Sequence, residues 1–182
     1  MYPYRSSPLF VLLLCLLTFS KAQSQEFAIY DSIPQLITRI QQAGNSTLVL
    51  NFWATWCKPC VEELPCFEEL RKQYADKNVQ VLLVSLDFKS QLEKKFLPFL
   101  RAQQLKSEVV LFTDQDANTW IPYIHDKWDG AIPVTLVFKG KATAISHGKF
   151  EDFADLEKFV LPFISDSANI TLKNIVNCNN GK

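Results

Sequence analysis

The chain has 182 residues, of which 48% are apolar, and its 19 basic residues balance 19 acidic ones. A chain of this size and apolar content can bury one hydrophobic core, so the composition favours a single globular domain and argues against a disordered protein. The charges form no basic cluster of the kind that binds a phosphate backbone, which argues against nucleic acid as a partner.

The first 22 residues have the three-part layout of a secretory signal peptide. Residues 1–7 are short and polar and carry Arg5, residues 9–19 form an apolar run, and Ser20 and Ala22 are the small residues that signal peptidase requires. The apolar run is about half of the roughly 20 residues that span a bilayer, which disfavours a permanent anchor. We therefore predict export to the periplasm or another extracytoplasmic compartment, with cleavage after Ala22.

The first half of the remaining chain alternates between helix and strand patterns. A helix is expected between Ser32 and Gly44, where apolar residues recur at helical spacing after a capping residue. The continuous apolar run at 47–53 predicts a strand that is buried on both faces, as in a parallel or mixed sheet. A helix kinked at Pro65 is expected to follow, and 79–86 predicts a second buried strand.

The second half continues this alternation and ends in a hairpin and a helix. In chain order, the patterns predict a helix at 92–105 bent at Pro98, a strand at 109–112, a short helix within 114–126, two hairpin strands at 134–138 and 142–146, and a last helix at 150–163. This order predicts an α/β fold whose central sheet has helices on both faces. The polar residues 165–182 are expected to form a loose C-terminal tail.

Two cysteines lie directly after the first buried strand, in the run Trp56-Cys57-Lys58-Pro59-Cys60. A thiolate rather than a thiol attacks a disulfide, and the N–H groups at a helix N-terminus, together with Lys58, favour the thiolate at Cys57. We therefore predict Cys57 as the nucleophile, Cys60 as the resolving cysteine, and a redox-active Cys57–Cys60 disulfide. A zinc site is disfavoured because no second pair with ligand spacing is present.

The other cysteines and the histidines give weaker signals. Cys15 leaves with the signal peptide, Cys66 is expected to be a small core residue outside the exchange, and its pairing with Cys178 stays open. His125 and His147 are isolated and favour structural or exposed roles. Glycosylation sequons begin at Asn45 and Asn169, and the sequence does not decide whether they are used.

The run NFWATWCKPC at 51–60 closely resembles the active-site strand and turn of the thioredoxin superfamily. The Ala-Thr-Trp-Cys form, with Glu63 and Pro65 downstream, is similar to the exported TlpA-like and ResA-like branch. Ile132-Pro133-Val134-Thr135 resembles the second hallmark of the superfamily, a cis-proline that opens a strand opposite the cysteines. The resemblance implies a thioredoxin fold for residues 23–164, with a mixed sheet and the extra β/α insert of the TlpA-like branch.

The resemblance also assigns roles to residues around the cysteines. It implies that Pro133 packs on the disulfide while the neighbouring backbone holds an extended substrate segment as an added strand. It places four residues at the substrate rim, namely Trp56, Lys58, Pro59 and Ile132, and implies that Ile132 blocks access of metals to the thiols. Asn51 occupies the place of a buried aspartate of thioredoxins, so Glu63 becomes the candidate proton shuttle for Cys60. The alternative for Glu63 is a solvated pair with Glu62 in the first helical turn.

What the resemblance implies for function is an exported thiol–disulfide oxidoreductase without metal or cofactor. It would act as a monomeric reductant of exported proteins that carry cysteines or disulfides, supplied by a membrane or soluble thiol–disulfide electron donor. Cytochrome c maturation is one task of such relatives. The motif alone does not set the reduction potential, so the direction of electron flow stays open.

Two other functions remain as alternatives. A thiol peroxidase shares the fold but needs threonine three residues before its reactive cysteine, where this chain has Ala54, with Thr55 one residue too late. A non-catalytic copper-binding assembly module, as in Sco-like proteins, uses a C-x-x-x-C spacing and a distal histidine. The C-x-x-C spacing of this chain does not match that pattern, although His125 is a histidine to consider.

Overall fold

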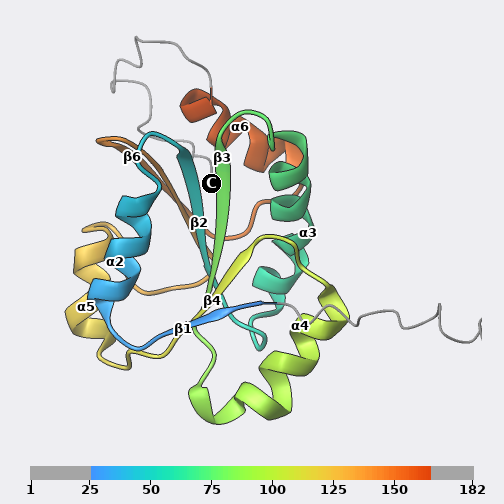
Figure 1. Ribbon diagram of the computed structural model, residues 1–182, viewed down its shortest axis with the longest axis vertical. Coiled ribbons are helices and arrows are strands. Elements are labelled where there is room, and N and C mark those ends of the chain that lie inside the picture. Colours follow the sequence, from blue (N-terminus) through green and yellow to red (C-terminus); the bar gives the residue numbers. More distant parts are fainter. Residues whose placement is uncertain (1–25, 165–182) are drawn as a thin grey trace, which may run out of the picture.

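The computed structural model describes residues 26–164 (Figure 1). The predicted signal peptide at 1–22, the predicted tail at 165–182, the Cys178 partner and the sequon at Asn169 all lie outside the described residues. Within 26–164, no helix combines the length and the apolar character needed to cross a membrane.

A six-stranded mixed sheet forms the centre of the fold, with the order β1-β4-β3-β2-β5-β6. Its strands are β1 Ala28–Tyr30, β2 Thr47–Trp53, β3 Val79–Ser85, β4 Glu108–Phe112, β5 Val134–Lys139 and β6 Ala142–His147. The first four strands of that order are parallel, β5 is antiparallel to β2, and β6 is antiparallel to β5. The predicted mixed α/β sheet is therefore confirmed.

Helices cover both faces of the sheet and make three layers (Figure 1). Helices α2 (Ile33–Gln42) and α5 (Ala117–Ile124) pack on one face. Helices α3 (Lys58–Gln73), α4 (Leu97–Gln103) and α6 (Phe153–Ile164) pack on the other. Because side chains alternate along a strand, β2 supplies both cores, and all seven of its residues are buried.

The predicted β/α insert falls between β3 and β5 along the chain, where α4, β4 and α5 lie. Strand β4 enters the sheet between β1 and β3, so the insert widens the parallel part of the sheet. Strand β1 was not among the predicted elements, because its three residues are too few to show a strand pattern.

Two predicted helices have different bounds in the structure. The expected helix at 92–105 is divided into a π-helical turn at Leu92–Phe96 and α4, and Pro98 lies in the first turn of α4, where a missing N–H is tolerated. The last helix begins at Phe153 rather than at Phe150. Asp152 accepts a hydrogen bond from the Asp155 backbone N–H at 3.0 Å and so caps the helix.

Parallel strands β2 and β3 end at the same edge of the sheet, and this edge carries the cysteine pair. The two strands are paired up to Trp53 and Ser85, and the Leu86 N–H donates to the Trp53 carbonyl at 2.8 Å. Beyond Trp53 the chain turns and enters α3, with Cys57 as the residue that caps the helix. The carboxyl edge of parallel strands is the usual location of binding and catalytic residues in α/β folds.

Candidate active site

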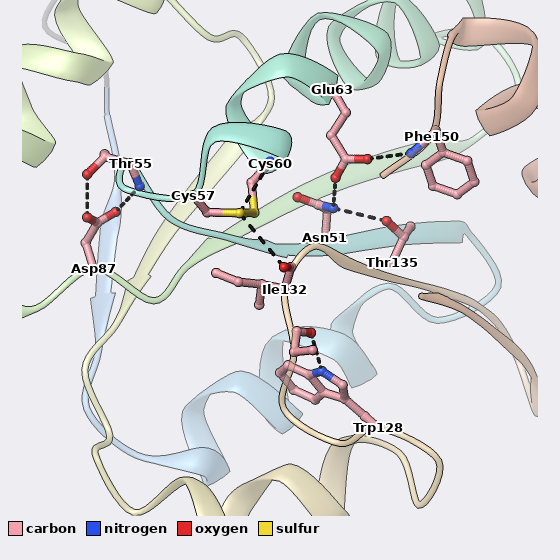
Figure 2. Close-up of a disulfide and its surroundings, with 11 residues drawn as sticks. Asn51, Thr55, Cys57, Cys60, Glu63, Asp87, Trp128, Ile132, Thr135 and Phe150 are labelled. Atoms are coloured by element: carbon pink, nitrogen blue, oxygen red, sulfur yellow. Dashed lines mark hydrogen bonds between the residues drawn. A yellow bond between two sulfur atoms is a disulfide. The ribbon is translucent and has the colours of Figure 1, made fainter. Parts of the chain in front are cut away.

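Cys57 and Cys60 form a disulfide at the N-terminus of α3 (Figure 2). Cys57 is 6% exposed and Cys60 is fully buried. An incoming sulfur atom therefore reaches the pair from the side of Cys57. This placement favours Cys57 as the attacking cysteine and Cys60 as the resolving one.

The helix N-terminus stabilises negative charge on Cys57. Its Sγ accepts a hydrogen bond from the Cys60 backbone N–H at 3.3 Å, as expected for a residue that caps α3. In the reduced protein this N–H and the helix dipole favour a thiolate at Cys57. The Lys58 side chain is 88% exposed and lies 3.8 Å from the Glu62 carboxylate. Pro59 lies exposed in the first turn of the helix.

The peptide bond between Ile132 and Pro133 is cis, and this loop lies against the disulfide. The Ile132 carbonyl oxygen is 3.9 Å from Cys57 Sγ (Figure 2). Pro133 is buried, and its carbonyl accepts a hydrogen bond from the Gly148 N–H at 3.0 Å. The two segments implied by the resemblance therefore meet at Cys57. Ile132 is partly buried, and Trp56, the residue before Cys57, is 58% exposed.

Trp128 fixes the segment that leads into the Pro133 loop, and this role was not predicted from the sequence. Its indole N–H donates to the Ala131 carbonyl at 2.8 Å. Its ring packs on Phe52 of β2, with centroids 4.4 Å apart. Because Phe52 is fully buried, this pair ties the loop before Ile132 to the core of the sheet.

Glu63 is buried rather than solvated, at 1% exposure. Its Oε1 accepts a hydrogen bond from Asn51 Nδ2 at 2.9 Å, and its Oε2 accepts one from the Phe150 backbone N–H at 3.0 Å. Burial raises the pKa of Glu63 from 4.5 to about 7, although both hydrogen bonds and nearby Lys149 partly oppose this rise. A carboxyl group with this pKa can both take up and release a proton near neutral pH.

Asn51 connects the Glu63 carboxyl to the neighbourhood of the disulfide. Figure 2 shows the Asn51 amide between the two, and its Nδ2 also donates to Thr135 Oγ1 at 3.0 Å. Asn51 Oδ1 is buried and has no hydrogen-bond partner within residues 26–164. A protonated Glu63 carries an O–H donor, and Asn51 Oδ1 can accept it once the amide turns over. The pair can thus accommodate both protonation states of Glu63.

A buried carboxylate, Asp87, fixes the turn that precedes the cysteines. Asp87 is 2% exposed and accepts hydrogen bonds from Thr55 N–H at 2.9 Å and Thr55 Oγ1 at 2.5 Å (Figure 2). It also accepts one from Ser85 Oγ at 2.7 Å. Asp87 was not among the residues predicted for the site. The only signal for it was its position just after a buried strand, at the edge where Cys57 also lies.

Replacing Asp87 with asparagine is expected to lower the free energy of unfolding by about 1–3 kcal/mol, because an amide nitrogen cannot accept the hydrogen bonds that one carboxylate oxygen accepts. Urea denaturation measures this change. Asp76→Asn is the matched control, since the Asp76 side chain is 77% exposed and its replacement should change stability by less than about 0.5 kcal/mol. Equal effects of the two variants would contradict the role of Asp87.

The remaining candidates lie apart from this chemistry. Cys66 lies within α3 and is partly buried against the core, and burial raises the pKa of its thiol. His125 Nδ1 accepts a hydrogen bond from the Lys127 N–H at 3.1 Å, and burial lowers the pKa of its imidazole. Within the described part of the chain, no group of three or more His, Cys, Asp or Glu residues could hold a metal ion. The hydroxyl of Thr55, the residue considered for the thiol peroxidase alternative, donates a hydrogen bond to Asp87.

Comparisons with known proteins point to one family. The profile of the AhpC/TSA family matches residues 22–147. The thioredoxin-like protein YneN of Bacillus subtilis is 39% identical over 72 residues, which cover 40% of this chain and 42% of YneN. The thiol–disulfide oxidoreductase ResA of Oceanobacillus iheyensis is 37% identical over 59 residues, which cover 32% of this chain and 31% of ResA. The matched segments thus span less than half of each relative.

Solved structures share the fold over a longer part of the chain. A secreted thiol–disulfide isomerase of Corynebacterium glutamicum has a TM-score of 0.56 and 17% identity, and the match covers 69% of this chain and 74% of the isomerase. A thiol:disulfide interchange protein of the thioredoxin family from Chlorobium tepidum has a TM-score of 0.53 and 18% identity, covering 69% of this chain and 84% of that protein. At these identities the likeness establishes the fold, and the fold is that of thioredoxin.

Proposed function

We infer the function from one established premise, that this chain belongs to the AhpC/TSA family. We propose that it is a thiol–disulfide oxidoreductase that exchanges disulfides with other proteins through Cys57 and Cys60. The observation that carries this proposal is the Cys57–Cys60 disulfide at the N-terminus of α3, exposed only at Cys57 and facing the Ile132–Pro133 loop. The ResA relatives named as thiol–disulfide oxidoreductases support it.

In the proposed reaction the reduced protein acts on a disulfide of its substrate protein. The Cys57 thiolate attacks one substrate sulfur, so a mixed disulfide forms while the other substrate sulfur leaves as a thiolate. Cys60, after losing its proton, then attacks Cys57 Sγ, which restores the Cys57–Cys60 bond and releases the reduced substrate. Glu63 accepts the proton of Cys60. The two residues are three apart on α3 and so share a face of the helix.

The proposal includes location and partners. The apolar run at 9–19 and the small residues before the predicted cleavage site favour an extracytoplasmic location, the periplasm in a cell that has one. The substrates would be exported proteins with disulfides. One example is cytochrome c, whose cysteines would be reduced during its maturation. The protein would act as a monomer, and a membrane or soluble thiol–disulfide donor would reduce the Cys57–Cys60 bond after each cycle.

A trapping experiment tests this function directly. In Cys60→Ser the resolving sulfur is absent, so the substrate stays bound to Cys57 as a mixed disulfide. We expect Cys60→Ser, exposed to an oxidised extracytoplasmic protein extract, to accumulate adducts that dithiothreitol releases and that mass spectrometry assigns to Cys57.

The matched control is the double variant Cys57→Ser/Cys60→Ser, which should form no adduct at this site. Adducts confined to Cys66 or Cys178 in Cys60→Ser would contradict the assignment. Rapid consumption of hydrogen peroxide by the wild-type protein, without any protein adduct, would instead favour the thiol peroxidase alternative.

A further inference from the structure

Two segments that leave the same edge of the sheet are joined beside the disulfide. Strands β2 and β3 are paired up to Trp53 and Ser85, and the Leu86 N–H extends this pairing by donating to the Trp53 carbonyl. Past the strand ends, the Thr55 N–H and hydroxyl both bond to Asp87 (Figure 2). These hydrogen bonds therefore hold the segments that follow β2 and β3 next to each other.

Each joined segment continues directly into a large exposed aromatic residue. Trp56 follows Thr55 and is 58% exposed, and Phe88 follows Asp87 and is 60% exposed. The aromatic residues inside β2, by contrast, are fully buried. Single exposed apolar side chains are common on protein surfaces, but these two follow the same bridged pair and Trp56 adjoins Cys57. Apolar surface is thus held next to the reacting sulfur.

We propose that Phe88 is a specificity-determining residue, which together with Trp56 contacts the substrate protein and selects segments whose cysteine is flanked by a large apolar side chain. The inference rests on the proposed disulfide exchange and names the class of substrate for it. The occupant of this surface is an extended segment of another protein, because the surface is continuous with the sulfur atom that such a segment must reach.

The position of the surface relative to the Pro133 loop explains the selectivity. To react, a substrate sulfur must come within bonding distance of Cys57 Sγ, and the Ile132 carbonyl lies 3.9 Å from that atom. Figure 2 shows the Thr55–Asp87 pair and Ile132 on different sides of the disulfide. A segment that passes over the disulfide from the Ile132 side reaches the side of the Thr55–Asp87 pair, which Trp56 and Phe88 directly follow in the chain. Contact of apolar surfaces there stabilises the complex in proportion to the area removed from water.

Reduction of symmetrical peptide disulfides tests the proposal. Two peptides are compared, one with leucine and one with serine on each side of a single cysteine, each joined to an identical copy through a disulfide. The reduced protein converts one peptide disulfide into two thiols while the Cys57–Cys60 bond forms. Because both sulfurs belong to identical peptides, attack on either one gives the same products.

We expect the wild-type protein to reduce the leucine peptide about fivefold faster than the serine peptide, in second-order rate constants. Phe88→Ser should bring this ratio close to one. Leu161→Ser is the matched control, because Leu161 is 41% exposed on α6. The end of α6 accepts a hydrogen bond from Thr47, which lies at the opposite end of β2 from Cys57. This control should keep the wild-type ratio.

The outcomes separate the proposal from the function on which it rests. A wild-type protein that reduces neither peptide contradicts the proposed function. Reduction of both at equal rates, or an unchanged preference in Phe88→Ser, overturns the role of Phe88 alone. Sedimentation provides a further arm, in which a wild-type dimer that Phe88→Ser converts to a monomer, with unchanged peptide preference, would assign the surface to self-association and overturn the proposal.

Discussion

Replacing Glu63 with glutamine is expected to slow the attack of Cys60 on the mixed disulfide about 100-fold near pH 8, the usual scale of general-base catalysis. The burial that raises the pKa of Glu63 to about 7 makes its ionised form available as a base only above that pH. The wild-type rate of this step should therefore rise with an inflection near pH 7, and Glu63→Gln should lack that inflection. Stopped-flow measurement of single turnovers over a pH series provides both values.

Glu62→Gln is the matched control for this variant. Glu62 is the preceding residue of α3, but its side chain is 46% exposed and pairs with Lys58 and Lys149 at the surface. Its replacement should leave the inflection near pH 7 in place. If Glu63→Gln retains that inflection as well, Glu63 does not accept the proton of Cys60.

The same variant has a second readout, in stability, whose sign follows from the pKa. The folded protein binds a proton at Glu63 up to about pH 7, whereas the unfolded chain releases it near pH 4.5. The stability contributed by the neutral carboxyl is therefore complete below about pH 4.5 and is lost as the pH rises to about 7. At 1.36 kcal/mol per pKa unit, the wild-type protein should lose about 3 kcal/mol more than Glu63→Gln over this range. Urea denaturation at several pH values measures the difference.

The glutamine side chain can be accommodated at this position. Its amide N–H needs an acceptor, and the buried Asn51 Oδ1, which has no partner in the described residues, supplies one once the Asn51 amide turns over. Its carbonyl oxygen can still accept the Phe150 N–H, as the Glu63 carboxylate does. A change in rate or stability in this variant therefore reports the loss of the titratable carboxyl group rather than a misfolded site.

The predicted parts of the fold are those that local patterns determine. Strand β2 was predicted with the bounds that the structure shows, Thr47 to Trp53, because this largely apolar run has no alternating polar face. The transition from this strand to a helix at Cys57 followed from the same reasoning, since Lys58-Pro59 fits a first helical turn. By contrast, helix α6 begins three residues later than predicted, because the side chain of Asp152, not the apolar pattern, determines its start.

The parts of the site that escaped prediction depend on contacts between distant segments. Asp87 lies 32 residues from Thr55, and no local pattern reveals that the two are bonded. Glu63 and Asn51 were each singled out, but their hydrogen bond and the contribution of the Phe150 N–H, which is 87 residues from Glu63, needed the folded chain. These contacts exist only in the folded chain, where segments that are distant in the sequence lie together.

The aromatic contact beneath the Pro133 loop leads to the largest expected change in stability. Phe52 is fully buried in β2 and packs on Trp128 at 4.4 Å and on Trp120 at 6.0 Å between ring centroids. Phe52→Ala removes this packing and leaves a cavity, so we expect the free energy of unfolding to fall by about 3–5 kcal/mol. Urea denaturation measures the loss, and near-UV circular dichroism should show altered tryptophan packing.

Phe88→Ala provides a control of the same chemical change at a different place in the fold. Phe88 is 60% exposed, so its truncation creates no cavity and should change stability by less than about 0.5 kcal/mol. The two phenylalanines would then have different roles at one edge of the sheet. Phe52 would support the Pro133 loop, and Phe88 would be available to a substrate. Comparable destabilisation by both variants would show that Phe88 is part of the core and would remove the physical basis for a docking surface beside Cys57.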